Sequence, residues 1–583
     1  TGLNTGGYRS MYLLQTTTIN GKSNQTIAGV SGNNTNFANL IIYSANSSGT
    51  ITLQTNTQLT VNGDLALSRG TLADGGNVIR VVGDISNSSI HSGTGRIELI
   101  GSVIQQILGN GTGRFGNLYL NQSYDVKMSV PTIITGVLTF RTKMLDIGSN
   151  LLVLSNTSTG ATAGNSSTSY IRTDGLISDA GVQKYYPTGA LDYTFPIGII
   201  GKYTPVRLNP TANTAAGIIT VIPVNSKHPC TTNSADYQLN YYWHVTFSGF
   251  AGLTISHYYT YLATDVTGNE NSYIGARFYN SAWTTGSAVN TATHQIRFLN
   301  VGYIDGDYTA GYVSEFGTVY TYYSRNATLG GNWDNVNTWS TVSHAGLAAS
   351  SYPNGQPVVI ATGHTVTANG NSRSAYTLTL NGTAFLDLAS TIGHSFGTVT
   401  GPGTIKLLLS GSGYFVFPSG NYNDFTSVSG GTIEMNSTAG TAILPYLTTY
   451  NNLILNGAGI KAMSDADITI NGLLTNSGPG TFSASSLNQL ILNSNWANNG
   501  YFIHNGGTTV FNGLTTLSGS IIPSLNNVII NQAKSLTPPT GAILAMEGDF
   551  TNNGTFNHNN GTLNFNGNTT IYGTSATTFN TVS

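Results

Sequence analysis

The sequence predicts an all-β chain in which two β-solenoid segments flank an immunoglobulin-like antiparallel β-sandwich. Three observations lead to this prediction. A block of residues near the C-terminus returns 54 positions later, from Trp496 to Phe550; a second short motif occurs towards both ends of the chain; and the middle of the chain carries neither. Repeats at a fixed period are typical of solenoids, in which each repeat stacks on its neighbour.

The 54-residue repeat keeps its register over a long stretch. Trp496-Ala-Asn-Asn-Gly returns as Phe550-Thr-Asn-Asn-Gly, and His504-Asn returns as His558-Asn. We expect a unit of this length to span two or more solenoid turns. Because His504 and His558 recur with the repeat, we interpret both as one structural corner and not as two active sites.

Residues 1–164 are predicted to form the N-terminal solenoid segment. The runs 50–53, 59–61, 65–67 and 78–82 are rich in Ile, Leu and Val and are bounded by Gly or Asn, as short strands between turns should be. A Phe-x-Asn-Leu-x-Ile motif occurs at 37–42 and 115–120, and variants of it return at 450–455 and 525–530. Asparagine tolerates the left-handed backbone of corners and can form amide ladders between turns.

Residues 165–322 are predicted to form an aromatic-rich β-sandwich module. The repeat motif disappears here, and longer strands are expected at 241–247, 255–261 and 276–279. Alternating, aromatic-rich strands separated by turns favour an antiparallel sandwich.

Residues 323–583 are predicted to form a capped C-terminal solenoid with the 54-residue repeats. The segment begins with Gly-Asn-Trp333-Asp and Asn-Thr-Trp339-Ser, and Gly-His364-Thr-Val follows. Terminal repeats of a solenoid need a cap, so we expect the two tryptophans to plug the first turn.

Composition excludes several classes of protein. Charged residues are 8% of the chain and the net charge is -2; a nucleic-acid partner is excluded because its binding needs a basic stripe. Cys230 is the single cysteine, which excludes an intrachain disulfide and a cysteine-based metal site. No apolar run is long enough to span a bilayer. Residues 579–583 open a further repeat, so we expect the chain to be part of a longer polypeptide.

Carboxylates offer the candidate metal ligands. Asp305 and Asp307 flank a glycine, and Asp465 and Asp467 precede a strand; either pair could hold a structural calcium ion, although a polar turn is the more common reason for such spacing. Asp265 and Glu270 form a third, similar pair. No catalytic residue and no other cofactor are predicted, since neither a Gly-x-Ser-x-Gly elbow nor a phosphate-binding loop before a helix occurs.

Tyrosines of the middle segment are candidates for stacking on sugar rings. Tyr241, Tyr258 and Tyr261 lie on the predicted strands, and some of them should face solvent if the strands alternate. Packing in the core is the more common fate of such rings.

The motifs together resemble those of the giant, repetitive, adhesin-like surface proteins of Bacteroidota. The resemblance covers Gln-x-Ile-x-Gly followed by Phe-x-Asn-Leu-x-Ile, the Phe195-Pro-Ile-Gly module with Tyr203-Thr-Pro, and the Gly-Asn-Trp333-Asp segment before Gly-His364-Thr-Val. It implies export by the type IX secretion system, an extracellular location at the cell surface, and the adhesive or filamentous role of gliding-type adhesins, but it names no ligand. Surface glycans are possible partners because of the tyrosines above, and self-association into filaments is possible because strand edges at the ends of a solenoid can pair with another copy. The C-terminal sorting domain usual in such proteins is absent from this sequence.

Two other functions compete with this expectation. β-Helix proteins often bind or degrade polysaccharides, and cleavage needs carboxylates that converge across a groove; in this chain 23 acidic residues are scattered over 583 positions. A fibre of a phage or a surface layer is the third alternative, and the fold alone does not separate it from an adhesin.

Overall fold

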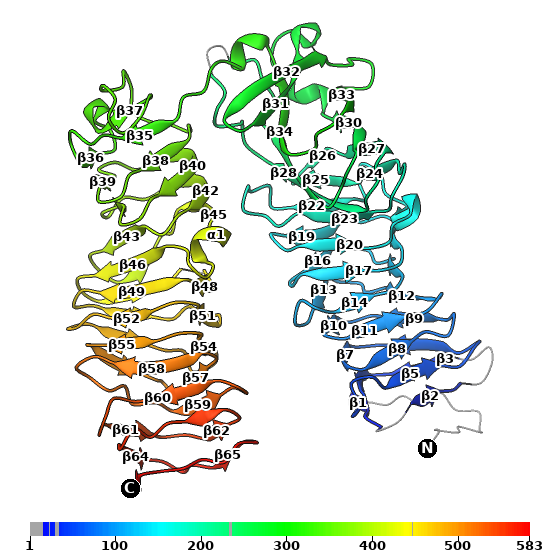
Figure 1. The fold of residues 1–583 in the computed structure, drawn as a ribbon. Helices are drawn as coiled ribbons and strands as arrows, with labels where there is room; N and C mark the ends of the chain where they lie inside the picture. Colours follow the sequence, from blue (N-terminus) through cyan, green and yellow to red (C-terminus); the bar gives the residue numbers. More distant parts are fainter. Residues whose placement is uncertain (1–15, 22–23, 30–33, 233–235, 446) are drawn as a thin grey trace. The chain divides into compact units, whose positions relative to one another are not determined.

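The computed structural model describes residues 16–21, 24–29, 34–232, 236–445 and 447–583. The chain divides into two compact units, residues 1–318 and residues 319–583. The regular secondary structure of both is almost entirely short β-strands, and both stack parallel strands turn upon turn in chain order (Figure 1). The predicted all-β class and the β-solenoid are therefore confirmed.

The solenoid of the first unit has three faces, so each turn contributes three strands. The first face stacks β1 (Thr16–Ile19), β4 (Asn39–Tyr43), β7 (Leu65–Arg69), β10 (Ile85–Asn87), β13 (Gln105–Leu108), β16 (Val126–Met128), β19 (Leu145–Gly148), β22 (Ile171–Thr173) and β25 (Ile197–Ile199). The second stacks β2 (Gln25–Ile27), β5 (Thr50–Leu53), β8 (Thr71–Ala73), β11 (Ile90–Ser92), β14 (Arg114–Phe115), β17 (Thr132–Ile134), β20 (Leu152–Leu154) and β23 (Val182–Tyr186). The third stacks β3 (Asn34–Phe37), β6 (Gln58–Val61), β9 (Val78–Val81), β12 (Arg96–Leu99), β15 (Leu118–Leu120), β18 (Leu138–Phe140) and β21 (Thr162–Ala163). The predicted strands at 50–53, 59–61, 65–67 and 78–82 correspond to β5, β6, β7 and β9.

Antiparallel sheets follow this solenoid within the same unit. β23 continues the second face into an antiparallel set, β28 (Gly217–Val224), β29 (Tyr242–Ser248), β34 (Gly306–Gly311), β31 (Ile274–Tyr279) and β32 (Ala282–Ala288). A separate four-stranded sheet contains β24 (Tyr193–Phe195), β27 (Val206–Ala212), β30 (Thr254–Thr260) and β33 (Gln295–Val301), and β26 (Lys202–Tyr203) pairs with β25.

The predicted antiparallel strands of the middle segment are confirmed as β29, β30 and β31. An immunoglobulin-like sandwich is not confirmed, because the larger sheet continues a solenoid face through β23. One hydrophobic core also runs from Leu40 of the solenoid to Tyr308 of the antiparallel sheets. The predicted division between residues 164 and 165 stays a prediction.

The second unit is a solenoid with Trp339 on β37 (Trp339–Ser340) and Trp333 directly after β36 (Gly330–Asn332) in its first turn. Its stacks are a six-stranded one, β37 (Trp339–Ser340), β35 (Tyr322–Ser324), β38 (Val358–Ile360), β40 (Ser374–Leu380), β42 (Ser395–Thr400) and β45 (Ser419–Asn421), and an eleven-stranded one, β36 (Gly330–Asn332), β39 (Thr365–Thr367), β41 (Phe385–Asp387), β43 (Thr404–Leu409), β46 (Thr432–Ser437), β49 (Asn452–Asn456), β52 (Leu474–Asn476), β55 (Trp496–Asn498), β58 (Leu514–Ser518), β60 (Ser535–Thr537) and β63 (Thr555–Phe556). Trp333 and Trp339 are fully buried edge to face, with ring centroids 5.2 Å apart, as expected of a plug.

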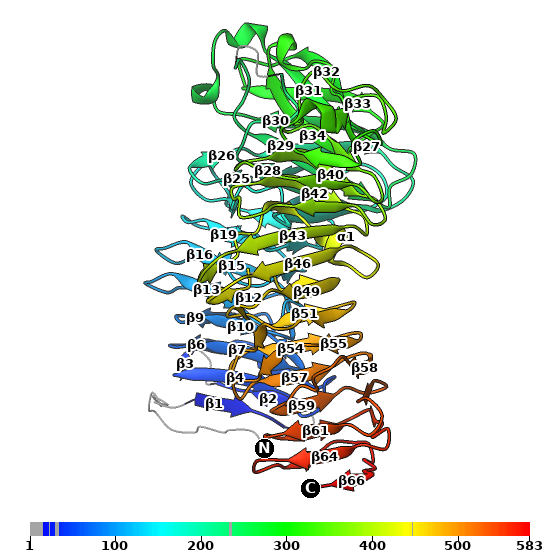
Figure 2. The same cartoon turned by 90° about the vertical axis from the view of Figure 1, so that its left-hand side faces the viewer.

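Three further stacks complete this solenoid, whose rungs Figure 2 shows from the side. They are β44 (Gly413–Tyr414), β47 (Thr441–Ile443), β50 (Ile460–Ala462), β53 (Thr481–Ser483) and β56 (Tyr501–Ile503); β48 (Thr449–Tyr450), β51 (Ile468–Ile470), β54 (Gln489–Leu492), β57 (Thr508–Phe511), β59 (Asn527–Ile530), β62 (Phe550–Asn552) and β65 (Ile571–Tyr572); and β61 (Ile543–Met546), β64 (Thr562–Phe565) and β66 (Thr581–Val582). The helical segments are α1 (Asn423–Thr426) and the short 3-10 turns η1 (Thr159–Ala161), η2 (Ala263–Asp265), η3 (Glu270–Ser272), η4 (Val313–Glu315) and η5 (Val336–Thr338).

Strand alternation explains the core of both solenoids. Along β49, for example, Leu453 and Leu455 are buried while the residues between and beside them are half-buried. Leu453 pairs with Leu474, and Leu474 pairs with Trp496, so each inward side chain stacks on its counterpart in the next turn. The result is a continuous apolar column that each added turn extends.

Candidate functional site

The Phe-x-Asn-Leu-x-Ile motif builds a corner that ties one turn to the next. In all four copies the asparagine side chain accepts a hydrogen bond from a backbone N–H in the following turn. The pairs are Asp64 N–H to Asn39 Oδ1 (2.8 Å), Val137 to Asn117 (2.9 Å), Leu473 to Asn452 (2.8 Å) and Asp549 to Asn527 (2.9 Å). The motif thus marks the same contact in both units, which we name the corner clasp.

A glycine in the next turn makes room for each corner clasp. The donor residue always follows a glycine, and a Cβ at that glycine would lie between 2.1 and 2.4 Å from the asparagine Oδ1; the four are Gly63, Gly136, Gly472 and Gly548. No real Cβ contact is that short. The paired Asn and Gly therefore form one structural unit spread over two turns.

A ladder of asparagine amides runs up the second solenoid, as predicted. Asn493 donates from Nδ2 to Oδ1 of Asn471 (2.8 Å), Asn512 to Asn493 (2.7 Å) and Asn531 to Asn512 (2.9 Å). The four side chains are half-buried. Each interior amide both donates to one turn and accepts from the next, which is the arrangement in which stacked amides strengthen each other.

The 54-residue repeat reproduces one turn geometry at two places. Nδ1 of His504 accepts the backbone N–H of Gly506 (3.0 Å), and Nδ1 of His558 accepts that of Asn560 (3.1 Å). The asparagine that follows each histidine has a left-handed backbone, with φ of 51° at Asn505 and 46° at Asn559. The interpretation of both histidines as a shared structural corner is confirmed.

Each copy of the repeat also contains an edge-to-face aromatic pair, and the first residues of the two pairs lie on different faces of the solenoid. Ring centroids lie 4.9 Å apart in Trp496–Phe502 and 5.6 Å apart in Phe550–Phe556. Trp496 lies on β55 of the eleven-stranded stack, whereas Phe550 lies on β62 of the seven-stranded stack. Neighbouring turns here pair residues 21 or 22 positions apart, such as Trp496 with Leu517. The repeat therefore spans more than two turns but not a whole number of them.

Asp307 lies at the centre of a buried polar cluster in the antiparallel region. Its Oδ2 lies 2.9 Å from Nε2 of His228, and its Oδ1 lies 2.5 Å from Nδ1 of His244. Burial alone would raise the pKa of Asp307, but the two histidines outweigh burial and hold that pKa well below its usual value. Burial lowers the pKa of His228, whereas Asp307 raises the pKa of His244 in spite of burial. Asp307 is therefore an ionised carboxylate that joins three segments of chain.

The candidate calcium ligands are not brought together around a common centre. Both oxygens of Asp307 face histidines, while Asp305 accepts the backbone N–H of Phe247 (3.0 Å). Asp465 and Asp467 are exposed, and Asp467 accepts the N–H of Gln489 in the next turn (2.7 Å). Within the described ranges no three His, Cys, Asp or Glu side chains converge as metal ligands; a structural calcium ion stays a prediction.

The third carboxylate pair also has separate partners. Asp265 accepts from Nζ of Lys202 (2.8 Å), and Oε1 of Glu270 accepts from the Tyr261 hydroxyl (2.6 Å) and pairs with Nδ1 of His294 (2.7 Å). These contacts fix the loops that follow β30, and they leave the carboxylates engaged with protein groups.

Two of the three candidate tyrosines are in the wrong place to stack on a sugar. Tyr241 and Tyr261 are each 1% exposed because their positions point into the core, so a ligand cannot reach their rings. Tyr258 is on the opposite side of β30 and is half-buried. The guanidinium of Arg207 lies over one face of its ring, 4.7 Å from the centroid. Tyr258 alone remains a candidate.

Two lysines are buried in the solenoid interiors. Lys461 on β50 donates to the carbonyls of Gly457 (2.7 Å) and Gly459 (2.8 Å), and Lys184 on β23 donates to the carbonyl of Tyr185 (2.7 Å). Burial lowers the pKa of both ammonium groups to about 8. Each buried cation is held by carbonyl dipoles in place of a carboxylate, which is an unusual arrangement.

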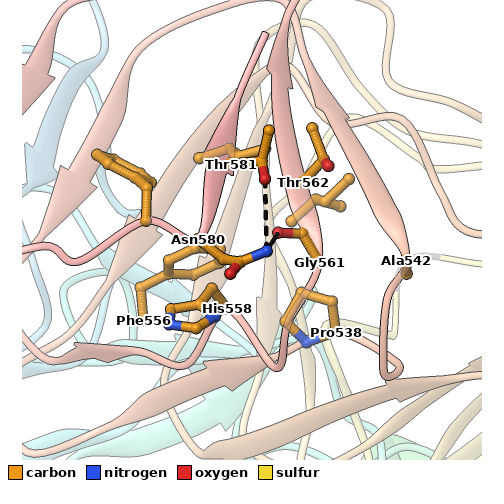
Figure 3. Close-up of a pocket in the computed structure, with 11 residues that line it drawn as sticks. Pro538, Ala542, Phe556, His558, Gly561, Thr562, Asn580 and Thr581 are labelled. Carbon is orange, nitrogen blue, oxygen red and sulfur yellow. Dashed lines mark hydrogen bonds between the residues drawn. The ribbon is translucent and has the colours of Figure 1, made fainter.

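Two hollows of the second unit lie around β63. Figure 3 shows one in which His558 lies among Phe556, Pro538 and Asn580; it is too tight to admit a water molecule. Asn580 donates to the carbonyl of Gly561 (3.3 Å), so this site is an internal packing gap between turns. A more open groove of about 510 Å³ has Lys534 and His558 in its lining. Neither hollow brings paired carboxylates together.

Comparisons with protein-family models, with curated proteins and with solved structures return no match for this chain. The described helical segments are all short, and none has the length and apolarity needed to cross a bilayer. The chain's own contacts therefore carry the functional argument.

Sequence reasoning did not find the partners of the polar sites. His228 and His244 are 79 and 63 positions from Asp307, and no spacing rule links them. Arg207 and Arg297 lie on either side of Tyr258, and this arrangement is evident only once the pairing of β27, β30 and β33 is known. The asparagine ladder does leave a signal in the sequence, because the dipeptide Asn-Gly recurs at 471 and 512.

Proposed function

We propose that the chain is an extracellular structural and adhesive protein that forms a rod or filament at the bacterial cell surface. The observation that supports this proposal best is the unbroken set of contacts from turn to turn. Backbone pairing, corner clasps and the asparagine ladder all run between successive turns of the solenoid. A pull along the stack must break the bonds of a whole turn together, so the fold suits a mechanical role.

The surface chemistry suits the same role. Charged residues are 8% of the chain, against roughly 25% in an ordinary soluble domain. Asparagine, threonine and serine supply the polar surface instead, and such a surface attracts few nonspecific ionic partners. The resemblance to adhesin-like proteins of Bacteroidota, with export by the type IX system, belongs to this proposal.

Electron microscopy of the purified chain tests the filament. We expect particles that join into longer rods as the protein concentration rises, and antibody labelling of intact cells should place the chain outside. Short single particles at every concentration would contradict self-association, and labelling only after lysis would contradict the surface location.

A carbohydrate-binding or polysaccharide-degrading role is the second candidate, and the outward position of Tyr258 supports it. A glycan array combined with a reducing-sugar assay tests it. Binding that is lost in Tyr258→Leu would support recognition of a glycan. Release of reducing ends that is lost in Asp465→Asn would support an enzyme and would overturn the structural role.

A further inference from the structure

The outer face of the four-stranded sheet of the first unit places a tyrosine between two arginines. Arg207 of β27 pairs with Tyr258 of β30, and Tyr258 pairs with Arg297 of β33. Residues paired in this way point to the same side of a sheet. Their chain neighbours on the other side, such as Leu208 and Tyr259, are fully buried. The three side chains therefore form one row on the outer surface.

The two arginines of the row are held differently. Asp192 binds Nε of Arg207 (2.8 Å) and Nη2 of Arg207 (2.5 Å), and the same guanidinium rests on the Tyr258 ring. Arg297 has no hydrogen bond or ion pair through its side chain to any described residue. One guanidinium is therefore fixed and charge-compensated, while the other carries an uncompensated positive charge.

Small polar residues surround the row on this face. Asn209 pairs with Ser256 on one side, and Thr260 pairs with Gln295 on the other. The face thus combines one aromatic ring, hydrogen-bonding groups and an unpaired cation, in a protein whose surface has few charges. Tyr258 is half-buried, and within the described residues Arg207 is the one ring or cation recorded over its ring.

We propose that this face binds a linear acidic polysaccharide, with Arg297 on an acidic group and a sugar ring against Tyr258. Charge complementarity with Arg297 selects an anion, and the polar side chains beside Tyr258 suit the hydroxyl-rich surface of a glycan. Asp192 already compensates Arg207, so Arg297 is the residue of the row that takes an acidic group of the glycan. The inference rests on the proposed adhesive role, for which it names the partner.

The test measures binding of a fluorescent hyaluronan decasaccharide to the full chain at low salt. Hyaluronan carries one carboxylate per disaccharide, and its carboxyl-reduced form is the uncharged control. We expect binding to hyaluronan, at least about tenfold weaker binding of the reduced form, and weakening by added salt. Equal binding of both forms would overturn the role of Arg297, and tighter binding of a poly-glutamate peptide of equal charge would overturn a glycan partner.

Variants then place the site. Arg297→Gln should weaken binding about tenfold, and Tyr258→Leu should weaken it several-fold. Arg114→Gln, an exposed arginine on β14 in the solenoid, is the matched control and should change binding less than about twofold. Wild-type affinity in Arg297→Gln would overturn the proposal. Unchanged thermal unfolding of each variant excludes misfolding. Failure of the wild-type chain to bind hyaluronan would overturn this glycan site, whereas filament formation is tested separately by electron microscopy.

Discussion

The second solenoid and the antiparallel sheets of the first unit bury polar groups in opposite ways. In the solenoid, a half-buried amide such as Asn493 finds its partners one turn away, at Asn471 and Asn512. In the antiparallel region, Asp307 finds its partners at His228 and His244, 79 and 63 positions away. In the solenoid, the partners of a polar side chain therefore recur from turn to turn. In the antiparallel region, the partners come from distant positions in the sequence and occur once.

This difference predicts how each region should respond to damage. A solenoid turn contacts mainly its two neighbours, so the loss of one contact weakens one rung. A carboxylate that joins three distant segments has no substitute, and its loss leaves buried His228 without its hydrogen-bond partner and half-buried His244 without its counter-charge. The antiparallel region should therefore be the more sensitive of the two to a single substitution.

Asp307→Ala should give the largest loss of stability. Removing one partner of a buried ion pair costs about 3–5 kcal/mol, and both histidines lose their carboxylate here. Chemical denaturation gives the free energy of unfolding, and hydrogen exchange shows whether β29 and β34 lose protection. Asp192→Ala is the matched control, since its ion pair with Arg207 is exposed and such pairs contribute about 1 kcal/mol or less. Equal effects of the two substitutions would remove the contrast between the regions.

Lys461 tests whether the solenoid tolerates a charge without a counter-charge. Its pKa in the folded chain is about 8, below about 10.4 in an unfolded chain. Between these values the unfolded state binds more protons, so the free energy of unfolding should rise with pH, by roughly 2 kcal/mol from pH 7 to 10. Above about pH 10 the trend should reverse, because burial raises the pKa of Tyr422 and Tyr450 and unfolded tyrosines ionise there.

Lys461→Met should abolish this rise in the transition of the second unit. Lys534→Met, which removes a lysine from the edge of a groove, should leave the pH profile as it is in the wild type. A profile that is the same in Lys461→Met and in the wild type would show that the buried ammonium is not the titrating group.

The same contrast explains how much the sequence could predict. Strand positions, the asparagine ladder and the corner at His504 and His558 all follow from local, repeated patterns, because a solenoid satisfies each residue with its counterpart in the next turn. The sequence indicates a turn at Asp307 and leaves calcium as one possible ligand, since nothing local reveals His228. It leaves Tyr241 either in the core or on the surface, because alternation gives two sides of a strand without saying which one is the core.

The corner clasp tests whether Asn452 and Gly472 act as one unit. Gly472→Ala should destabilise the second unit by roughly 1–2 kcal/mol, because the new Cβ would lie 2.3 Å from Oδ1 of Asn452. Asn452→Ala should cost about 1 kcal/mol, the value of its bond to the Leu473 N–H. The double variant should lose less than the sum of the two, since Asn452→Ala removes the shortest contact of the new Cβ and leaves only those with Asn451. Strict additivity in chemical denaturation would show that the two residues act independently.

Substitutions of Asn493 and Asn531 should have the smallest effect on the free energy of unfolding. They test whether hydrogen bonds between successive turns stabilise the solenoid. Asn493 lies inside the ladder and makes two amide bonds, whereas Asn531 at its end makes one, to Asn512. At roughly 0.5–1.5 kcal/mol for each bond, Asn493→Ala should cost about twice as much as Asn531→Ala. Both side chains are half-buried, so the difference in free energy of unfolding reports the number of ladder bonds and not burial. Equal losses would mean that each rung is satisfied by water as well as by its neighbour, and the ladder would then stabilise the solenoid no more than isolated surface amides do.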